Sequence, residues 1–339
     1  MLDRSEVRES YAGRKVMITG GLGFIGSNLA RELVGFGSHV TIVDSMLPNY
    51  GARLGNVSDI RDVIDLNISD IRDTHSLQHL LRGHDVIFNL AGQTSHLDSM
   101  TNPYTDLEIN CASQLSLLET CREVNPHARI VFASTRQIYG RPRYLPVDED
   151  HPIQPVDVNG INKTAGEWYH MLYGRVHGMN VTALRLTNTY GPRMRIADAR
   201  QTFLGLWVRA VVKGEEITVL GSGTQLRDFT FIDDAVHAFL LAGADPRADG
   251  RVYNVGGGPP ISLRDLAEMV IELAGGGTYA FAPFSADLKV IDIGDYYADA
   301  SRIRSELGWE PTTPLEEGLA RTIAFYRSEE LSQWLEDHD

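Results

Sequence analysis

The chain has 339 residues, of which 43% are hydrophobic and 22% are charged. This composition fits one large α/β domain or two unequal ones, with enough length to bury a core. The 31 Lys and Arg residues against 45 Asp and Glu give a net charge of -14, which argues against nucleic acid or an anionic membrane surface as the main partner.

Cys111 and Cys121 are ten residues apart, which is neither a disulfide framework nor a metal-ligand spacing, so we expect no metal site. The charged N-terminus carries no apolar signal core, and no apolar run reaches the roughly 18 residues that a membrane span needs. We therefore expect a cytoplasmic protein that is neither secreted nor bound to a membrane.

Strands and helices are predicted to alternate along the first half of the chain. Residues 1–13 look like a loose leader. Apolar runs predict strands at 15–20, 39–44, 85–91, 129–135 and 180–186. Helical periodicity falls between them, at 24–37, 74–83, 105–124 and 162–178. This alternation predicts an α/β fold with a Rossmann-like, doubly wound parallel sheet.

The pattern loosens beyond residue 190. Helices at 201–214 and 262–275 mix with short strands at 217–221 and 252–256. We expect a Rossmann domain over residues 14–190, together with some later segments that return to it. A smaller α/β lobe over 191–330 would bind the substrate.

A glycine-rich turn joins the first predicted strand to the first helix. Gly20, Gly23 and Gly26 permit a tight turn and a close approach of the backbone to a pyrophosphate at the helix N-terminus. Asp44 ends the second strand, 18 residues after Gly26. A carboxylate there can accept a hydrogen bond from a ribose 2′-hydroxyl and would repel a 2′-phosphate, so the pattern predicts NAD rather than NADP.

The glycine spacing is TGxxGxxG, and it is followed by NLAG, STRQIYG, the lysine of NGINK, LRLTNTYGP and LRDFTFIDD. Together these motifs resemble the extended short-chain dehydrogenase/reductase family, the nucleotide-sugar epimerases and dehydratases. The resemblance runs from about residue 14 to about residue 327. It implies a bound nicotinamide cofactor that removes hydride from a sugar carbon and returns it to the keto-sugar intermediate.

The resemblance also implies roles for individual residues. Thr135 matches the catalytic Ser/Thr, and Lys163 would hold the nicotinamide ribose. The cofactor would be lined by Gly20, Gly23, Phe24, Ile25, Gly26, Asp44, Asn67, Ile68, Leu90, Ala91, Gly92 and Lys163. The nucleotide-diphosphate sugar would be contacted by Gln93, Arg136, Asn188, Arg193 and Arg227. Asn67 departs from the family, which usually has Asp there.

Asn159 stands where the family has its catalytic tyrosine, four residues before Lys163. An amide can orient a hydroxyl but cannot take its proton. His96 is one candidate for the missing base, because histidine exchanges protons near neutral pH. Tyr104 and Asp98 are weaker candidates, and a deprotonated Lys163 is another. The remaining alternative is a protein that only binds NAD or a nucleotide sugar.

The residues after Thr135 help to choose the reaction. Dehydratases and decarboxylases of the family usually have acidic residues there, whereas this chain has Arg136 and Gln137. We therefore expect a nucleotide-sugar epimerase, with a UDP-hexose or UDP-uronic acid as substrate. A dehydratase or 4-oxidoreductase is the alternative. Arg136 could hold a substrate carboxylate or lie on the surface, and the sequence favours neither.

Two further expectations concern arginines and assembly. Arg193 belongs to a group with Arg195 and Arg200 that follows a predicted strand, where open α/β sheets bind ligands. The helical segments over 105–121 and 162–176 resemble the pair that forms family homodimers, so we expect a homodimer.

Overall fold

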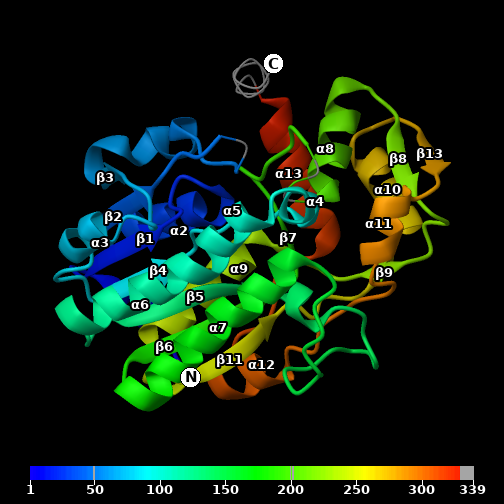
Figure 1. Cartoon of the computed structure of the whole chain (residues 1–339). Helices are drawn as coiled ribbons and strands as arrows, with labels where there is room; N and C mark the ends of the chain where they lie inside the picture. The colour runs from blue at the N-terminus through cyan, green and yellow to red at the C-terminus, as the bar shows by residue number, and fades with distance from the viewer. Residues whose placement is uncertain (49, 199, 201, 329–339) are drawn as a thin grey trace.

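The computed structural model describes residues 1–328 except 49, 199 and 201. Its core is a seven-stranded parallel sheet in the order β11-β6-β5-β4-β1-β2-β3 (Figure 1). The strands are β1 (Lys15–Thr19), β2 (His39–Asp44), β3 (Asp65–Ile68), β4 (Val86–Asn89), β5 (Arg129–Thr135), β6 (Asn180–Leu186) and β11 (Arg251–Val255). The predicted α/β, Rossmann-like fold is thereby confirmed, because β4 and β2 flank β1 and reverse the strand order there.

Helices cover both faces of this sheet. One face carries α3 (Thr74–Leu80), α6 (Ser113–Val124) and α7 (Val158–His177), and the other carries α2 (Phe24–Gly35) and α9 (Ile232–Ala244). Four strands, β1, β4, β5 and β6, are almost entirely buried, as expected for a parallel sheet covered on both sides.

A second group of elements packs beside the carboxyl edge of the sheet (Figure 1). It contains α8 (Phe203–Lys213), β8 (Ile217–Leu220), α10 (Leu263–Leu273), β13 (Tyr279–Ala282), α11 (Ala286–Ile291) and α13 (Leu315–Arg327). Two short pairs connect it to the sheet: β7 (Asn188–Tyr190) with β10 (Phe229–Phe231), and β9 (Leu226–Arg227) with β12 (Ile261–Ser262). The division at residue 190 remains a prediction.

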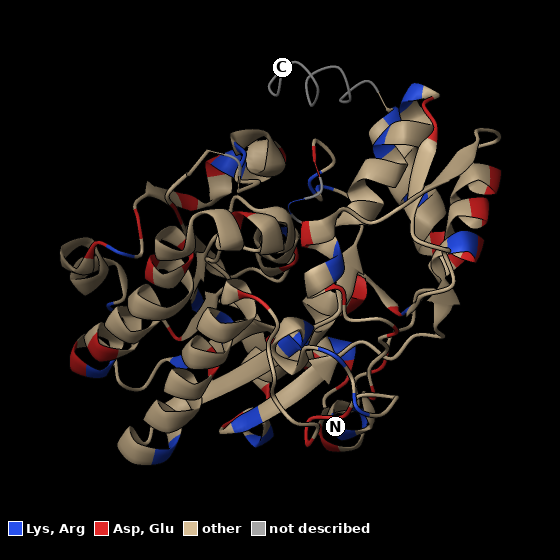
Figure 2. Cartoon of the chain, turned by 45° about the vertical axis from the view of Figure 1, so that its right-hand side comes forward, with Lys and Arg blue, Asp and Glu red and all other residues tan. Residues whose placement is uncertain are grey.

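Shorter elements fill the connections. They are α4 (His96–Thr101), α5 (Pro103–Leu107), α12 (Ser301–Leu307), the 3-10 segments η1 (Leu54–Val63), η3 (Arg136–Tyr139) and η4 (Pro246–Ala248), and a π-helical segment η2 (Glu108–Ala112). Acidic and basic segments are intermixed along the helices seen in Figure 2. Within the described part of the chain, no helix is long and apolar enough to cross a membrane.

One expectation about local structure was wrong. Residues 1–13 are not a loose leader, because Arg4–Tyr11 forms helix α1 behind an Asp3/Glu6 capping box. The Tyr11 side chain is fully buried, and its hydroxyl donates to the Leu240 carbonyl, 2.9 Å away in α9. The predicted strand near 252–256 is one of the later segments that return to the main sheet, where it pairs with β6 as the seventh strand.

The predicted helix over 105–124 is present as a continuous helical run of α5, η2 and α6, and its middle turn is π-helical. Ser113 Oγ and Gln114 Nε2 both donate to the Ile109 carbonyl, at 2.6 and 3.0 Å, within this segment. Asn110, also in the segment, bonds the backbone of Gln93 through both ends of its amide. The irregular turn therefore ties this helix to the loop after β4.

Candidate active site

The glycine turn lies at the carboxyl end of β1, where the strand order reverses. Gly20 has a φ of 70°, in the left-handed region that favours glycine. A Cβ on Gly20 would lie 2.9 Å from the Ala91 backbone nitrogen, and one on Gly26 would lie 2.4 Å from the Gly20 carbonyl oxygen. The turn can therefore approach β4 and its own helix only with glycine at these positions.

Asp44 ends β2 beside this turn and is 7% exposed. Its carboxylate accepts from the backbone N–H groups of Leu22 at 3.1 Å and Met46 at 2.9 Å. Burial raises the pKa of the carboxyl, and the two backbone donors offset part of that effect. The side chain is thus fixed at the edge of the pocket that the glycine turn lines.

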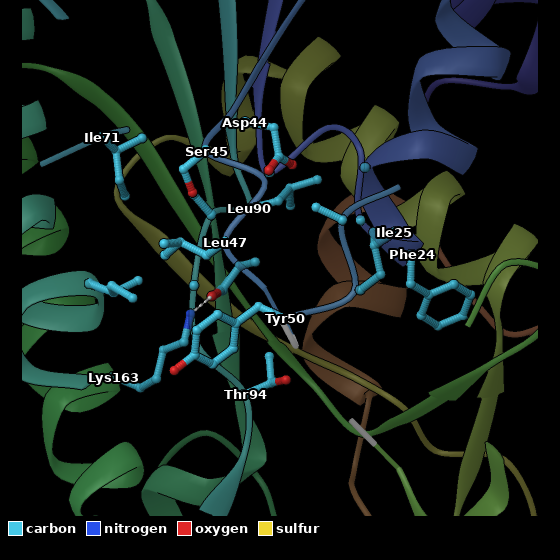
Figure 3. Close-up of a pocket in the computed structure, with 18 of the residues that line it drawn as sticks. Phe24, Ile25, Asp44, Ser45, Leu47, Tyr50, Ile71, Leu90, Thr94 and Lys163 are labelled. Carbon is cyan, nitrogen blue, oxygen red and sulfur yellow. Dashed lines mark hydrogen bonds between the residues drawn. The ribbon is translucent and has the colours of Figure 1, made fainter. Parts of the chain in front are cut away.

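One pocket joins the glycine turn to the predicted catalytic residues (Figure 3). Asp44 lies at one end of the view and Lys163 at the other, with Leu90 between them. The pocket is lined by Gly20, Gly23, Phe24, Ile25, Gly26, Asp44, Leu90, Ala91, Gly92, Thr135, Asn159 and Lys163, which were all predicted to lie at the site. A glycine cradle with a carboxylate at its edge and a lysine beyond it fits NAD.

Asn67 and Ile68 lie just before the part of the chain that lines this pocket. Ile68 is 53% exposed, and the Asn67 side chain accepts from the hydroxyl of Ser69. The pocket wall instead includes Ser69, Asp70 and Ile71. Contact of Asn67 and Ile68 with adenine stays a prediction.

Lys163 is 5% exposed, and its ammonium group donates to the Ala133 carbonyl at 3.2 Å. Nζ also lies 5.1 Å from the centre of the Phe132 ring. Burial lowers the pKa of Lys163 from its ordinary value of 10.5 to about 8, and the charge of Asp106 offsets only part of this. A Cβ on Gly92 would lie 2.8 Å from Nζ, so this glycine makes the space that Lys163 occupies.

Asn159 is 1% exposed and is committed to hydrogen bonds. Its Nδ2 lies 2.8 Å from the Gln93 carbonyl, 3.0 Å from Gln93 Oε1 and 2.8 Å from Asp106 Oδ2. The other carboxylate oxygen of Asp106 accepts from Asn162 Nδ2 at 2.8 Å. Asn159 therefore joins the start of α7 to the loop after β4 and to α5.

His96 lies close to Thr135 through Gln137. Its Nδ1 is hydrogen-bonded to Asp157 Oδ2, and its Nε2 lies 2.6 Å from Gln137 Nε2. The backbone N–H of Gln137 donates to Thr135 Oγ1 at 3.2 Å. The sequence interpretation assigned no role to Asp157 or Gln137. Asp157 could have been found as the helix cap two residues before Asn159.

Tyr50 was also missed. It lines the pocket from the loop after β2, and Lys163 lines the same pocket from α7 (Figure 3). Burial, followed by the negative charges of Asp98 and Asp106, raises the pKa of the Tyr50 hydroxyl. No local spacing relates Tyr50 to Lys163, since they are brought together only by the fold.

Three of the predicted substrate residues come together beyond Thr135. Arg136 Nη2 lies 3.4 Å from Asn188 Oδ1, and the Arg136 guanidinium lies 5.0 Å from the centre of the Tyr296 ring. Burial lowers the pKa of Arg136. It also lowers that of Arg227 to about 10, and the positive charge of Arg136 adds to the effect. Two partly or fully buried guanidiniums in each other's field favour an anion beside them.

The remaining predicted residues lie elsewhere. Gln93 is buried behind the pocket wall, where its Nε2 donates to the Ser95 carbonyl at 2.9 Å. Arg193 has a φ of 72° and donates to Asn28 Oδ1 at 3.1 Å, with its guanidinium over the Phe325 ring. It lies beside α2 and α13 rather than with Arg136, and its contact with substrate stays a prediction.

A glycine cradle, a fixed carboxylate and a buried lysine around one pocket define an NAD-binding α/β protein. Residues 16–256 match the NAD dependent epimerase/dehydratase family. The chain therefore belongs to this family, as the resemblance to extended short-chain dehydrogenases/reductases predicted. It is an enzyme, and NAD is its cofactor.

Individual relatives cover nearly the whole chain. A putative UDP-glucose 4-epimerase of Methanocaldococcus jannaschii is 30% identical over 92% of this chain and 98% of that protein. UDP-glucuronate 4-epimerase 4 of Arabidopsis thaliana is 30% identical over 93% of this chain and 76% of that protein. Among solved structures, the dTDP-glucose 4,6-dehydratase DesIV of Streptomyces venezuelae with NAD bound has a TM-score of 0.87 at 26% identity, covering 96% of this chain and 100% of that one.

Proposed function

We propose that the chain is an epimerase of nucleotide-diphosphate sugars that acts through a transient keto sugar. The observation that carries this proposal is the pairing of two neighbouring sites. The NAD pocket includes Thr135 and Lys163, and Arg136, which follows Thr135 in sequence, lies within the electrostatic field of Arg227. Relatives named as nucleotide-sugar epimerases over almost the full chain support it.

When bound, NAD supplies the acceptor, and then the donor, of a hydride. The chain's own residues do the rest. Asp44 would hold the adenosine ribose, and the Lys163 ammonium group would hold the nicotinamide ribose. Thr135 would orient the reacting sugar hydroxyl through its own hydroxyl group.

Arg227 and Asn188 suit the diphosphate, and Arg136 suits a further anionic group on the sugar. Arg136 is next in sequence to Thr135, so a group that it binds would belong to the reacting sugar. Within the described residues, no carboxylate forms an ion pair with Arg136 at 4.0 Å or less, so its guanidinium can receive an anion from the ligand. This favours a uronic acid, such as a UDP-uronic acid, over a neutral UDP-hexose.

Epimerisation fits better than 4,6-dehydration or decarboxylation. Those reactions use acidic side chains after the Thr135 position, and Arg136 and Gln137 are not acids. An epimerase needs only one proton acceptor that also returns the proton.

The test is incubation of the purified protein with UDP-, dTDP-, GDP- and CDP-sugars, in neutral and uronic forms. Product mass and stereochemistry are followed together with absorbance of reduced nicotinamide. We expect an epimer of unchanged mass, formed fastest from a uronic acid. Loss of water or carbon dioxide would indicate a dehydratase or a decarboxylase. Absence of both turnover and cofactor reduction would instead support a binding protein.

We also propose a homodimer formed through α6 and α7. One face of α7 exposes large apolar side chains at helical spacing: Ile161 (56%), Trp168 (58%), Leu172 (40%) and Val176 (60%). The helix packs against α6 on its other side. A row of this kind is unfavourable in water and is typical of a protein interface.

A further inference from the structure

A histidine–carboxylate pair lies beside the position of the missing tyrosine. His96 begins α4, and Asp157 caps α7. The Asp157 side chain is 1% exposed and that of His96 is 38% exposed. Asp157 uses one oxygen to accept from the Gly160 N–H at 2.7 Å and the other to bond His96 Nδ1. The carboxylate is thus fixed from both sides, and it fixes the imidazole ring.

The ionisation of Asp157 sets the histidine tautomer. Burial raises the pKa of the Asp157 carboxyl, but the hydrogen bond and charge of His96, together with the Gly160 N–H and the charge of Arg136, bring the pKa below its ordinary value. A carboxylate can only accept, so Nδ1 must carry the hydrogen. The lone pair of a neutral His96 is therefore on Nε2.

Nε2 faces the end of the Gln137 side chain, 2.6 Å away. Gln137 lines the pocket, and its Oε1 is buried with no hydrogen-bond partner. The amide can satisfy His96 in both protonation states. The amide N–H group of Gln137 donates to the neutral ring. When the amide flips so that its oxygen faces Nε2, that oxygen accepts from the protonated ring. This environment suits a histidine that gains and loses a proton.

The pair is also near the reacting residues. Gln137 follows Thr135 by two residues and bonds its hydroxyl, and Asp157 precedes Asn159 by two. The lone pair of Nε2 is therefore directed at the Gln137 side chain, and Gln137 lines the pocket together with Thr135 and Asn159. A sugar hydroxyl that replaces the Gln137 amide at Nε2 would also lie near Thr135.

We infer that His96, held by Asp157, is the proton acceptor that replaces the tyrosine. The inference rests on the proposed epimerase function. The O–H bond of the sugar hydroxyl would break, its proton would form a bond with Nε2, and its electron pair would become the second bond of the carbonyl, while bound NAD would supply the acceptor for the hydride that leaves the same carbon. In the return step the same cofactor would give the hydride back and His96 would return the proton to the oxygen, so no further reactant is needed. His96 is the catalytic residue, and Asp157 is a positioning residue.

Other groups in the region suit the role less well. The pKa of Tyr50 is raised, so its hydroxyl gives up a proton less readily than an ordinary phenol. Tyr104 is 75% exposed. Asp98 is paired with Arg200 at 2.8 Å. Lys163 donates to a backbone carbonyl and is needed by the cofactor.

The test uses His96→Ala, Asp157→Asn and the double variant, with the sugar that the wild-type protein epimerises. We expect His96→Ala to lower kcat by roughly 10²- to 10⁴-fold, with NAD affinity measured by calorimetry unchanged. Added imidazole should restore part of kcat, because the side chain is partly exposed and its removal leaves an open space. Asp157→Asn should lower kcat but not KM, and imidazole should rescue the double variant less well because the carboxylate no longer orients it.

Asp73→Asn is the matched control. Asp73 caps α3 by the same kind of bond, in which backbone N–H groups donate to its carboxylate. Helix α3 packs against α6, whereas α4, which begins with His96, packs against α5 and α7. The Asp73→Asn variant should leave kcat unchanged. If His96→Ala keeps kcat within about fivefold of the wild type, or raises KM with no rescue by imidazole, the inference is wrong while the epimerase function stands. If the wild type epimerises no sugar, both are wrong.

Discussion

The buried charge of Lys163 should lower the folding stability of the protein. At 5% exposure its ammonium group has lost most of its water, and its pKa falls from 10.5 to about 8. At about 1.4 kcal/mol for each pKa unit, this difference corresponds to about 3 kcal/mol of folding free energy lost at neutral pH. Lys163→Met would remove that cost while keeping most of the buried volume. It would also lose the bond to the Ala133 carbonyl, worth about 1 kcal/mol.

Without NAD, Lys163→Met should therefore be about 2 kcal/mol more stable than the wild type near neutral pH. The pKa of Lys163 is lower in the folded than in the unfolded state, so the wild-type penalty is complete below about pH 8 and disappears as pH rises from there to 10.5. The advantage of the variant should shrink over that window. Urea unfolding at several pH values, with and without NAD, measures both effects, and NAD should stabilise the variant less than the wild type.

Lys213→Met is the control, because Lys213 lies exposed at the end of α8 and should change stability by less than about 0.5 kcal/mol. A Lys163→Met protein that is less stable than the wild type near neutral pH would refute the reasoning. So would a stability difference that does not change with pH.

Three further predictions address other parts of the molecule. Arg136→Gln should lower kcat/KM by roughly 10²-fold for a uronic acid sugar and by less than about threefold for the neutral counterpart. Both substrates are measured side by side, and equal losses would mean that Arg136 binds no carboxylate. If the proposed dimer forms, Trp168→Glu should convert it to a monomer in light scattering, and an unchanged mass would contradict the proposed interface. Asn159→Tyr should destabilise the protein by about 1–3 kcal/mol in urea unfolding, because Asp106 and Gln93 lose a partner, and higher activity with unchanged stability would contradict this view.

The parts of the site that were predictable from sequence are those fixed by local spacing. The glycine turn and Asp44 each occupy a set distance from the end of a strand, so hydrophobic periodicity and motif spacing were enough to locate them, whereas Lys163 was assigned through the resemblance to the family. They all line the same pocket in the structure.

Contacts between distant segments could not be predicted in this way. His96 and Asp157 are 61 residues apart, and Tyr50 reaches the pocket from a loop that has no periodicity. Helix α1 was missed for a different reason. Only Val7 and Tyr11 are buried in this helix. Two apolar residues one turn apart are too few for the sequence pattern to distinguish a helix packed on the domain from a solvated leader.

The surroundings of Asn159 argue that the loss of the tyrosine is part of a different site rather than decay of the usual one. If the tyrosine had simply been lost, its buried polar neighbours would be left without hydrogen bonds, at a cost of about 1–3 kcal/mol each. Here the Asn159 amide satisfies Gln93 and Asp106, and Asn162 bonds the second oxygen of Asp106. A satisfied polar network rigidifies the start of α7. Because Asp157 lies two residues before Asn159, this rigidity also holds Asp157 against His96. Asn159 cannot take a proton itself, but it helps to position the His96–Asp157 pair that is proposed to take it.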